Sequence, residues 1–125
     1  MDTAKRNELL WVSPALILYA ALVWHFQFVQ DDAYISYRYV ANFLNGHGLV
    51  WNIGERVEGY TNHGWVILLS LFGSLGIDFI LMSRVIGFLC GAGVVWVAWR
   101  IGRTVMGEAA GIAQVIPAYL AAASL

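Results

Sequence analysis

Two adjacent carboxylates, Asp31 and Asp32, follow directly after a long apolar segment of this 125-residue sequence. A carboxylate at the start of a helix stabilises that helix by roughly 0.3–1 kcal/mol, and one carboxylate would be enough for this purpose. A pair at the edge of an apolar segment costs more than a cap requires, and one member could instead act as a general base. The residues alone leave both interpretations, helix capping and proton transfer, open.

The residues that follow the acidic pair have the spacing of a short helix over residues 31–45. Gly46 is expected to end this helix, because glycine readily adopts the left-handed conformation that terminates helices. Residues three, four and seven positions apart share a helical face, which here carries Asp31, Tyr34, Ile35, Arg38 and Asn42. The guanidinium of Arg38 could therefore bind a phosphate on the same side as a carboxylate, or could equally face lipid headgroups.

The polar stretch continues to position 63. The sequence predicts a turn over residues 52–55 between two short extended segments, which would bring Glu58 and Tyr60 back towards Leu49 and His47. Such a hairpin could cover a site or be no more than a compact loop. His63 is predicted to begin the next helix, whose N-terminus would suit an anionic ligand, but the spacing does not decide whether one binds.

The composition restricts the class of protein. Hydrophobic residues make up 60% of the chain and charged residues 12%, whereas a soluble domain is about half apolar and about a quarter charged. This balance indicates a membrane protein and excludes a disordered segment. A net charge of −1 without a lysine or arginine cluster argues against nucleic-acid binding. The single cysteine excludes an intrachain disulfide and a cysteine-based zinc cluster, and the three histidines lack metal-ligand spacing.

Apolar runs and their flanking charges predict the elements that position these residues. We expect an all-α, multi-pass membrane protein with the acidic pair in an outer loop that carries juxtamembrane helices. Basic residues before the first run and after the second place both ends in the cytoplasm. The predicted organisation is a cytoplasmic N-terminus at 1–8, a membrane helix at 9–29, an outer (periplasmic) loop at 30–63, a re-entrant or interfacial helix at 64–77, a membrane helix at 79–99, a cytoplasmic loop at 100–107 and a third membrane helix at 108–125.

Single residues refine this organisation. The last run is still apolar where the sequence ends, so we expect its helix to be truncated and the chain to be a piece of a longer protein. Pro117 would kink that helix, and Asp78 is expected to cap the helix that follows it. Two Gly-x-x-x-Gly spacings, at 87–91 and 107–111, suit close helix packing, or simply reflect how common glycine is in membrane helices.

The loop residues resemble those of a known family. Segments 31–39 (DDAYISYRY), 46–52 (GHGLVWN) and 54–65 (GERVEGYTNHGW) are similar to the first outer loop of bacterial GT-C glycosyltransferases, multi-pass membrane enzymes that use a polyprenyl-phosphate sugar. The resembling group includes mycobacterial terminal β-(1→2)-arabinofuranosyltransferases, and protein mannosyltransferases and the lipid A aminoarabinose transferase are more distantly alike. The resemblance covers about residues 9–115, and its motifs are fairly specific as an ordered set.

The resemblance implies the N-terminal part of a GT-C-type fold and a catalytic acidic pair. Asp31 is the expected general base, which deprotonates the acceptor hydroxyl, and Asp32 would position the acceptor, a cation or its neighbour. The related mannosyltransferases have Asp-Glu where this chain has Asp-Asp, which leaves open which carboxylate is the base. They also have His-Pro-Pro where this chain has Asn-His-Gly-Trp at 62–65, which puts a role for His63 in doubt. The expected substrate-binding residues are Tyr34, Arg38, Glu58, Tyr60 and His63.

The same resemblance implies the partners and the location. The expected donor is a polyprenyl-phosphate sugar and the acceptor is a cell-envelope glycan, lipid or protein, with Arg38 and Arg84 as local candidates to bind the departing phosphate. No tightly bound cofactor is expected, and dependence on a divalent cation is left open. We expect a bacterial inner-membrane location with the active loop on the outer face, and an inactive 125-residue piece. The alternative is a small non-catalytic membrane subunit or scaffold whose outer loop binds a partner.

Overall fold

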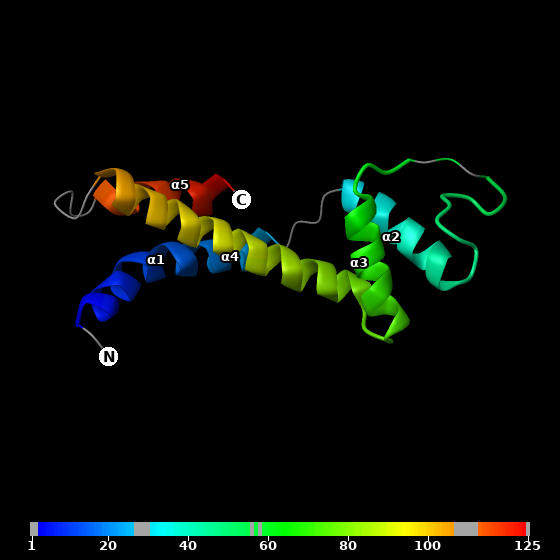
Figure 1. Cartoon of the computed structure of the whole chain (residues 1–125), viewed down its shortest axis with the longest axis horizontal. Helices are drawn as coiled ribbons and strands as arrows, with labels where there is room; N and C mark the ends of the chain where they lie inside the picture. Colours follow the sequence, from blue (N-terminus) through cyan, green and yellow to red (C-terminus); the bar gives the residue numbers. More distant parts are fainter. Residues whose placement is uncertain (1–2, 27–30, 56, 58, 107–112, 125) are drawn as a thin grey trace. The chain divides into compact units, whose positions relative to one another are not determined.

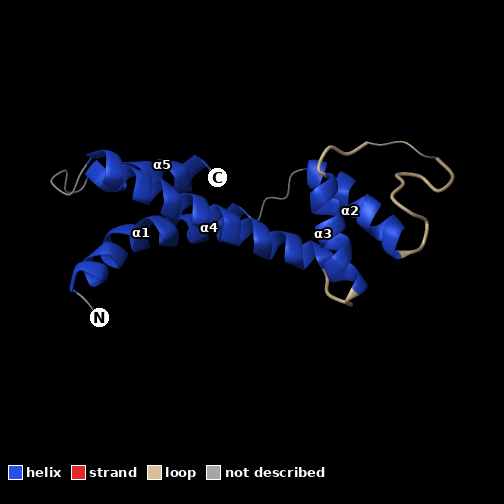
Figure 2. Ribbon diagram, in the orientation of Figure 1, coloured by secondary structure: helices blue, strands red, loops and turns tan. Residues whose placement is uncertain are grey.

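The computed structural model describes residues 3–26, 31–55, 57, 59–106 and 113–124, without the side chains of residues 3–9. Helices, turns and loops make up this described part, and it contains no strand (Figure 2). The predicted all-α class is therefore confirmed. The helices are α1 Thr3–Phe26, α2 Asp31–Leu44, α3 His63–Ser74, α4 Phe79–Met106 and α5 Ile116–Ser124 (Figure 1).

The chain forms two compact units. One, which we call the helical unit, comprises Met1–Gln27 and Gly87–Leu125; the other, the loop unit, comprises Phe28–Ile86. Helix α4 begins in the loop unit and continues into the helical unit. Each unit has its own buried apolar cluster.

The helical unit packs α1, α4 and α5 through spaced apolar residues. Val12, Ala15 and Tyr19 are buried at helical spacing on α1, and Val95 and Trp99 are buried one turn apart on α4. The cluster also includes Val115, Ala118 and Ala122 at and beyond the start of α5. The unit thus buries a narrow stripe of each helix and leaves the other faces apolar and exposed, as in Leu10, Ile17, Trp24, Leu89, Val94, Ile101, Val105 and Leu120.

Glycines permit the closest approaches in the helical unit. Tyr19 donates a hydrogen bond to the carbonyl oxygen of Phe88 (3.2 Å) and stacks on that ring, and a Cβ at Gly91 would collide with the tyrosine hydroxyl. At Gly102 a Cβ would lie 2.5 Å from the carbonyl oxygen of Gln114, whereas Gly87 has open space. Of the two predicted Gly-x-x-x-Gly spacings, the first has one glycine in close contact, Gly91. The second, at residues 107–111, lies outside the described residues.

The loop unit packs α2 against α3 with their N-termini at the same end. Near these N-termini the amide nitrogen of Asn62 donates to Ser36 Oγ (2.8 Å), and near the C-termini Leu44 packs directly over Gly73. Two helices that meet at both ends in this order run in the same direction, so residues 45–62 must return along them. Between the helices lies a buried cluster of Tyr37, Tyr39, Val40, Val66 and Leu69.

Local capping defines the helix ends of the loop unit. Gly46 has φ +81°, and the amides of Gly46 and His47 bond back to Phe43 and Asn42, which confirms the predicted end of the 31–45 helix. Gly76, with φ +79°, ends α3 in the same way. Asp78 Oδ1 accepts the amides of Ile80 (2.8 Å) and Leu81 (3.1 Å), so its predicted capping of the following helix is also confirmed.

Three local expectations were wrong. Residues 100–106 continue α4 instead of forming a loop, and Arg100 and Arg103 lie over the rings of Trp96 and Trp99, one turn earlier, at 5.6 and 5.1 Å. Pro117 occupies the first turn of α5, where a missing amide hydrogen costs nothing, so it begins a helix and does not kink one. The turn at 52–55 does form, but the described residues on either side pair with side chains of α2 and not as strands.

Helix α4 is the one described helix that is long and apolar enough by itself to cross a membrane. A second candidate arises if Leu10–Phe26 of α1 and Asp31–Leu44 are counted as one bent span; residues 27–30 between them lie outside the description. Helix α3 is apolar but has only 12 residues. A membrane crossing by α4 is thus supported, and the multi-pass topology and its orientation stay predictions.

The close packing at Gly102 generates a test. We expect Gly102→Ala to lower the free energy of unfolding by about 1–3 kcal/mol, because the backbone carbonyl of Gln114 must move to admit the methyl group. Gly93→Ala in the same helix is the matched control, since no atom lies within 4 Å of its Cβ position. The free energy of unfolding of each variant is measured in dodecyl maltoside by titration with sodium dodecyl sulfate, with circular dichroism to monitor the loss of helix. Equal stability of the two variants would contradict the close packing.

Candidate functional site

The N-terminus of α2 presents the acidic pair to solvent. Asp31 and Asp32 form the first turn of the helix, and both are exposed. No lysine or arginine of the described residues forms an ion pair with either carboxylate, and none of these residues combine into a set of three that could hold a metal ion. Both carboxylates are therefore accessible to a bound molecule from this end of α2.

The two aspartates lead onto different faces of α2. Asp32 lies one turn before Ser36, which is buried against the rest of the loop unit. Because Ser36 binds the side chain of Asn62, the face that carries Asp32 leads to the start of α3. Asp31 lies one turn before Ile35, which lines a surface pocket between α2 and the following loop. The helix thus connects each carboxylate with a different neighbour.

Arg38 is engaged by the loop that follows α2. Its Nε donates to the carbonyl oxygen of Trp51 (2.9 Å), its guanidinium lies over the Trp51 ring at 4.9 Å, and its Nη2 reaches Asn52 Oδ1 (3.4 Å). Asn42, one turn later, donates to the carbonyl oxygens of Val50 (2.7 Å) and Trp51 (3.0 Å). The face predicted to bind phosphate therefore holds the loop backbone, and phosphate binding by Arg38 stays a prediction.

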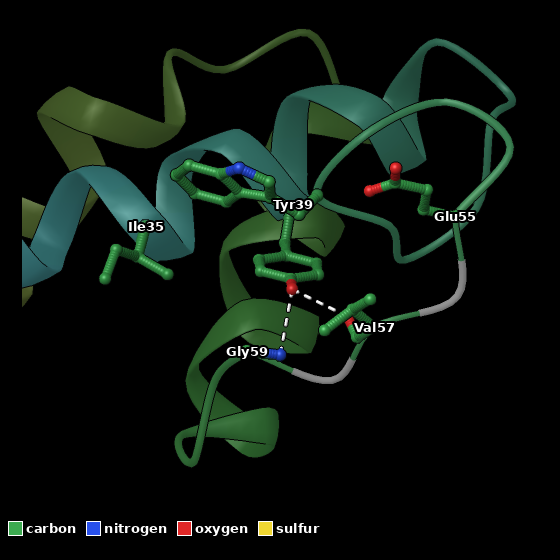
Figure 3. A pocket seen from close by; sticks show the side chains of 6 residues that line it. Ile35, Tyr39, Glu55, Val57 and Gly59 are labelled. Carbon is green, nitrogen blue, oxygen red and sulfur yellow. Dashed lines mark hydrogen bonds between the residues drawn. The ribbon is translucent and has the colours of Figure 1, made fainter.

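Tyr39 was not predicted as a functional residue. It forms hydrogen bonds with the backbone of the second half of the loop that connects α2 to α3. Its side chain is completely buried, and its hydroxyl donates to the carbonyl oxygen of Val57 (2.8 Å) and accepts the amide of Gly59 (2.9 Å), as Figure 3 shows. The spacing of apolar residues on α2 places Tyr39 in the core, but carries no signal for these hydroxyl partners, which are 18 and 20 residues away.

Tyr60 and His63, both predicted to bind substrate, lie together at the start of α3. The tyrosine hydroxyl and His63 Nδ1 are 3.0 Å apart, and the two rings stack with an interplanar angle of 13°. The Tyr60 ring also packs on Tyr39 with its centroid at 4.3 Å, so the pair continues the aromatic core to the surface. Of the other two predicted binding residues, Tyr34 is exposed with its edge against Tyr37, and Glu58 lies outside the described residues.

A pocket of about 300 Å³ lies between α2 and the loop, and we call it the aromatic pocket (Figure 3). The described residues of its walls are mostly apolar, with one carboxylate. Neither Trp51 nor Glu55 was predicted as a site residue, although the sequence does show both within the polar stretch. The aromatic pocket is lined by Ile35, Tyr39, Trp51, Glu55, Val57 and Gly59.

The Tyr39 hydroxyl generates a prediction. Tyr39→Phe removes the partner of two loop backbone groups, and we expect this to lower the free energy of unfolding of the loop unit by about 1–3 kcal/mol. The amide of Gly59 should then exchange with solvent at least tenfold faster, measured by hydrogen–deuterium exchange. Tyr34→Phe is the control on the same helix, because its side chain is 56% exposed. Unchanged protection of Gly59 would show that the loop is held by other contacts.

The sequence of this chain is similar to that of a terminal β-(1→2)-arabinofuranosyltransferase of Mycobacterium tuberculosis, with 39% identity over 69 residues. The similarity covers 54% of this chain and 11% of that enzyme, so the chain matches about a tenth of the relative's length. No protein-family profile matches the chain, and no solved structure matches it. At the coarse level, the similarity supports a relationship to glycosyltransferases.

Proposed function

We propose that this chain takes part in glycosyl transfer at a membrane, with a polyprenyl-phosphate sugar as donor and a cell-envelope glycan, lipid or protein as acceptor. Asp31 is the general base and Asp32 positions the acceptor. The acceptor oxygen attacks the anomeric carbon, its proton moves to the Asp31 carboxylate, and the bond from the anomeric carbon to the phosphate oxygen breaks. Polyprenyl phosphate leaves with the bonding electrons.

The observation that carries this proposal is the similarity to the arabinofuranosyltransferase. At 39% identity over 69 residues, the relationship is clear enough to suggest a shared chemistry, though not the sugar or the linkage. The pentose in the relative's name makes arabinose the first sugar to test.

The geometry at the start of α2 is compatible with a general base. A base must come within about 2.6–3.2 Å of the proton donor in the substrate complex, so its carboxylate has to be accessible yet held on a fixed element. Asp31 and Asp32 are exposed, and the helix that carries them is anchored in the loop unit by Tyr37, Tyr39 and Val40. Fixed positioning of this kind supplies much of the rate enhancement in group transfer.

The proposed donor requires a chain that has a membrane-spanning helix. A polyprenyl chain remains in the bilayer while its phosphate stays at the surface, and α4 is long and apolar enough to cross a membrane. Arg84 is exposed in the second turn of α4, and Arg38 is exposed on α2, so both are candidates to stabilise the departing phosphate. Tyr34, Glu58, Tyr60 and His63 remain the proposed contacts to the sugars.

The roles of the acidic pair are tested by Asp31→Asn and Asp32→Asn, introduced into the gene in its native setting. Asparagine keeps the size and capping ability of aspartate but cannot accept the acceptor proton, so we expect Asp31→Asn to reduce transfer by about 10²–10⁴-fold. Transfer is measured in membranes with a radiolabelled polyprenyl-phosphate arabinose as donor. Asp32→Asn should raise KM for the acceptor more than it lowers kcat.

Asp78→Asn is the matched control, because Asp78 caps α4 and asparagine caps equally well. This variant should retain full transfer. Undiminished transfer by both Asp31→Asn and Asp32→Asn would refute the base assignment. No transfer from this donor by the unaltered protein, together with transfer from another polyprenyl-phosphate sugar, would change the sugar and retain the mechanism.

A further inference from the structure

We propose that the aromatic pocket binds a single sugar ring of the acceptor. This inference rests on the proposed function, because that function makes the acceptor a glycan or a molecule that bears one. It adds a binding subsite, formed by Trp51, Glu55 and Val57 around Tyr39, to a site whose predicted residues lie elsewhere on α2 and at the start of α3.

The size and walls of the aromatic pocket fit one ring. Small-molecule sites have volumes of roughly 300–1,000 Å³, and at about 300 Å³ this pocket is at the lower limit, too small for an extended chain. The accessible aromatic wall is the ring of Trp51, which is 36% exposed; the buried ring of Tyr39 supports it, with centroids 6.0 Å apart and planes inclined at 48°. The negative face of an aromatic ring attracts the weakly positive C–H groups on the apolar face of a sugar.

The polar group of the aromatic pocket is a carboxylate with spare accepting capacity. Glu55 Oε2 accepts a hydrogen bond from the side-chain nitrogen Nδ2 of Asn52 (3.0 Å). The side-chain oxygen Oδ1 of Asn52 accepts one from Arg38 Nη2 (3.4 Å). Within the described ranges, no group donates a hydrogen bond to Glu55 Oε1. Sugar hydroxyls are donors, and hydrogen bonds to a carboxylate are about twice as strong as those between neutral groups.

Charge selects between the two sugar substrates. Among the described residues that line the aromatic pocket there is no lysine or arginine, and their one charged group is the Glu55 carboxylate. A donor sugar carries a phosphate on its anomeric carbon, which this carboxylate would repel. A neutral acceptor sugar meets no such repulsion, so the aromatic pocket suits the acceptor.

The aromatic pocket is formed before any ligand arrives. The Tyr39 hydroxyl fixes the backbone of Val57 and Gly59, and a Cβ at Gly59 would lie 2.9 Å from that hydroxyl, so the wall at Gly59 admits no larger residue without a shift. Walls that are already ordered lose little conformational entropy when a ligand binds, so even a small ligand can bind with a useful affinity.

The test is saturation-transfer-difference NMR on the full chain in dodecyl maltoside micelles. The probes are methyl α-arabinofuranoside and arabinofuranose 1-phosphate, which carries its phosphate on the anomeric carbon as the proposed donor does. We expect saturation transfer to the ring protons of the neutral probe, and at least threefold less to the phosphate. No transfer to the neutral probe would overturn the proposal, and stronger transfer to the phosphate would overturn the assignment to the acceptor.

Val57→Phe should fill the aromatic pocket while it leaves intact the main-chain oxygen that Tyr39 binds. Ile53→Phe is the matched control, because this residue is in the same loop, is similarly exposed and does not line the aromatic pocket. We expect Val57→Phe to reduce saturation transfer at least fivefold, Glu55→Gln to reduce it at least threefold, and Ile53→Phe to leave it unchanged. Equal signals from Val57→Phe and Ile53→Phe would place any sugar binding outside the aromatic pocket.

Asp31→Asn separates this inference from the proposed function. It should bind methyl α-arabinofuranoside as the unaltered chain does, because Asp31 does not line the aromatic pocket. If Asp31→Asn binds the sugar and also retains full transfer, the subsite proposal stands and the assignment of Asp31 as the base is refuted. If Asp31→Asn loses transfer but the unaltered chain binds no sugar, the assignment of Asp31 as the base stands and the subsite proposal is refuted.

Discussion

The loop unit depends on one buried hydroxyl group. Residues 45–62 connect two helices that run in the same direction, so this segment must travel the length of α2, and its described part has no strand partner to satisfy its backbone groups. Tyr39 supplies both a donor and an acceptor in the middle of that path, at Val57 and Gly59. Each such hydrogen bond contributes about 0.5–1.5 kcal/mol, so this side chain helps to hold the loop wall of the aromatic pocket.

The parallel arrangement of α2 and α3 has an electrostatic consequence. Both helix N-termini, each with a partial positive charge, lie at one end of the loop unit. Asp31 and Asp32 contribute negative charge at this end, whereas the first turn of α3 has no acidic residue. Stabilisation of the helix ends is thus compatible with the proposed role of Asp31 as a base, since the partial positive charge at this end favours both carboxylates.

The sequence predicted the features that depend on neighbours along the chain. Helical spacing after Asp31, the helix stop at Gly46 and the cap at Asp78 each involve residues within one or two turns of each other. The roles of Arg38 and Tyr39 were not predictable, because their partners are 13 to 20 residues away and are mostly backbone groups, which have no sequence signature. Gly102 was missed for the same reason, since only the path of the chain near Gln114 makes a methyl group there too large.

Helix α2 also places the proposed base close to the proposed subsite. Asp31 and Ile35 are one turn apart on one face, which corresponds to about 6 Å along the helix axis, close to the length of one sugar ring. On the proposed function, a ring held against Ile35 and Trp51 would place the next ring of the acceptor, with its hydroxyl, towards Asp31. Because both positions belong to one helix anchored by Tyr37, Tyr39 and Val40, the separation between base and acceptor is fixed by the backbone of α2 itself. Within the loop unit, the geometry of helix α2 alone therefore determines the distance between the proposed acceptor subsite and the proposed base.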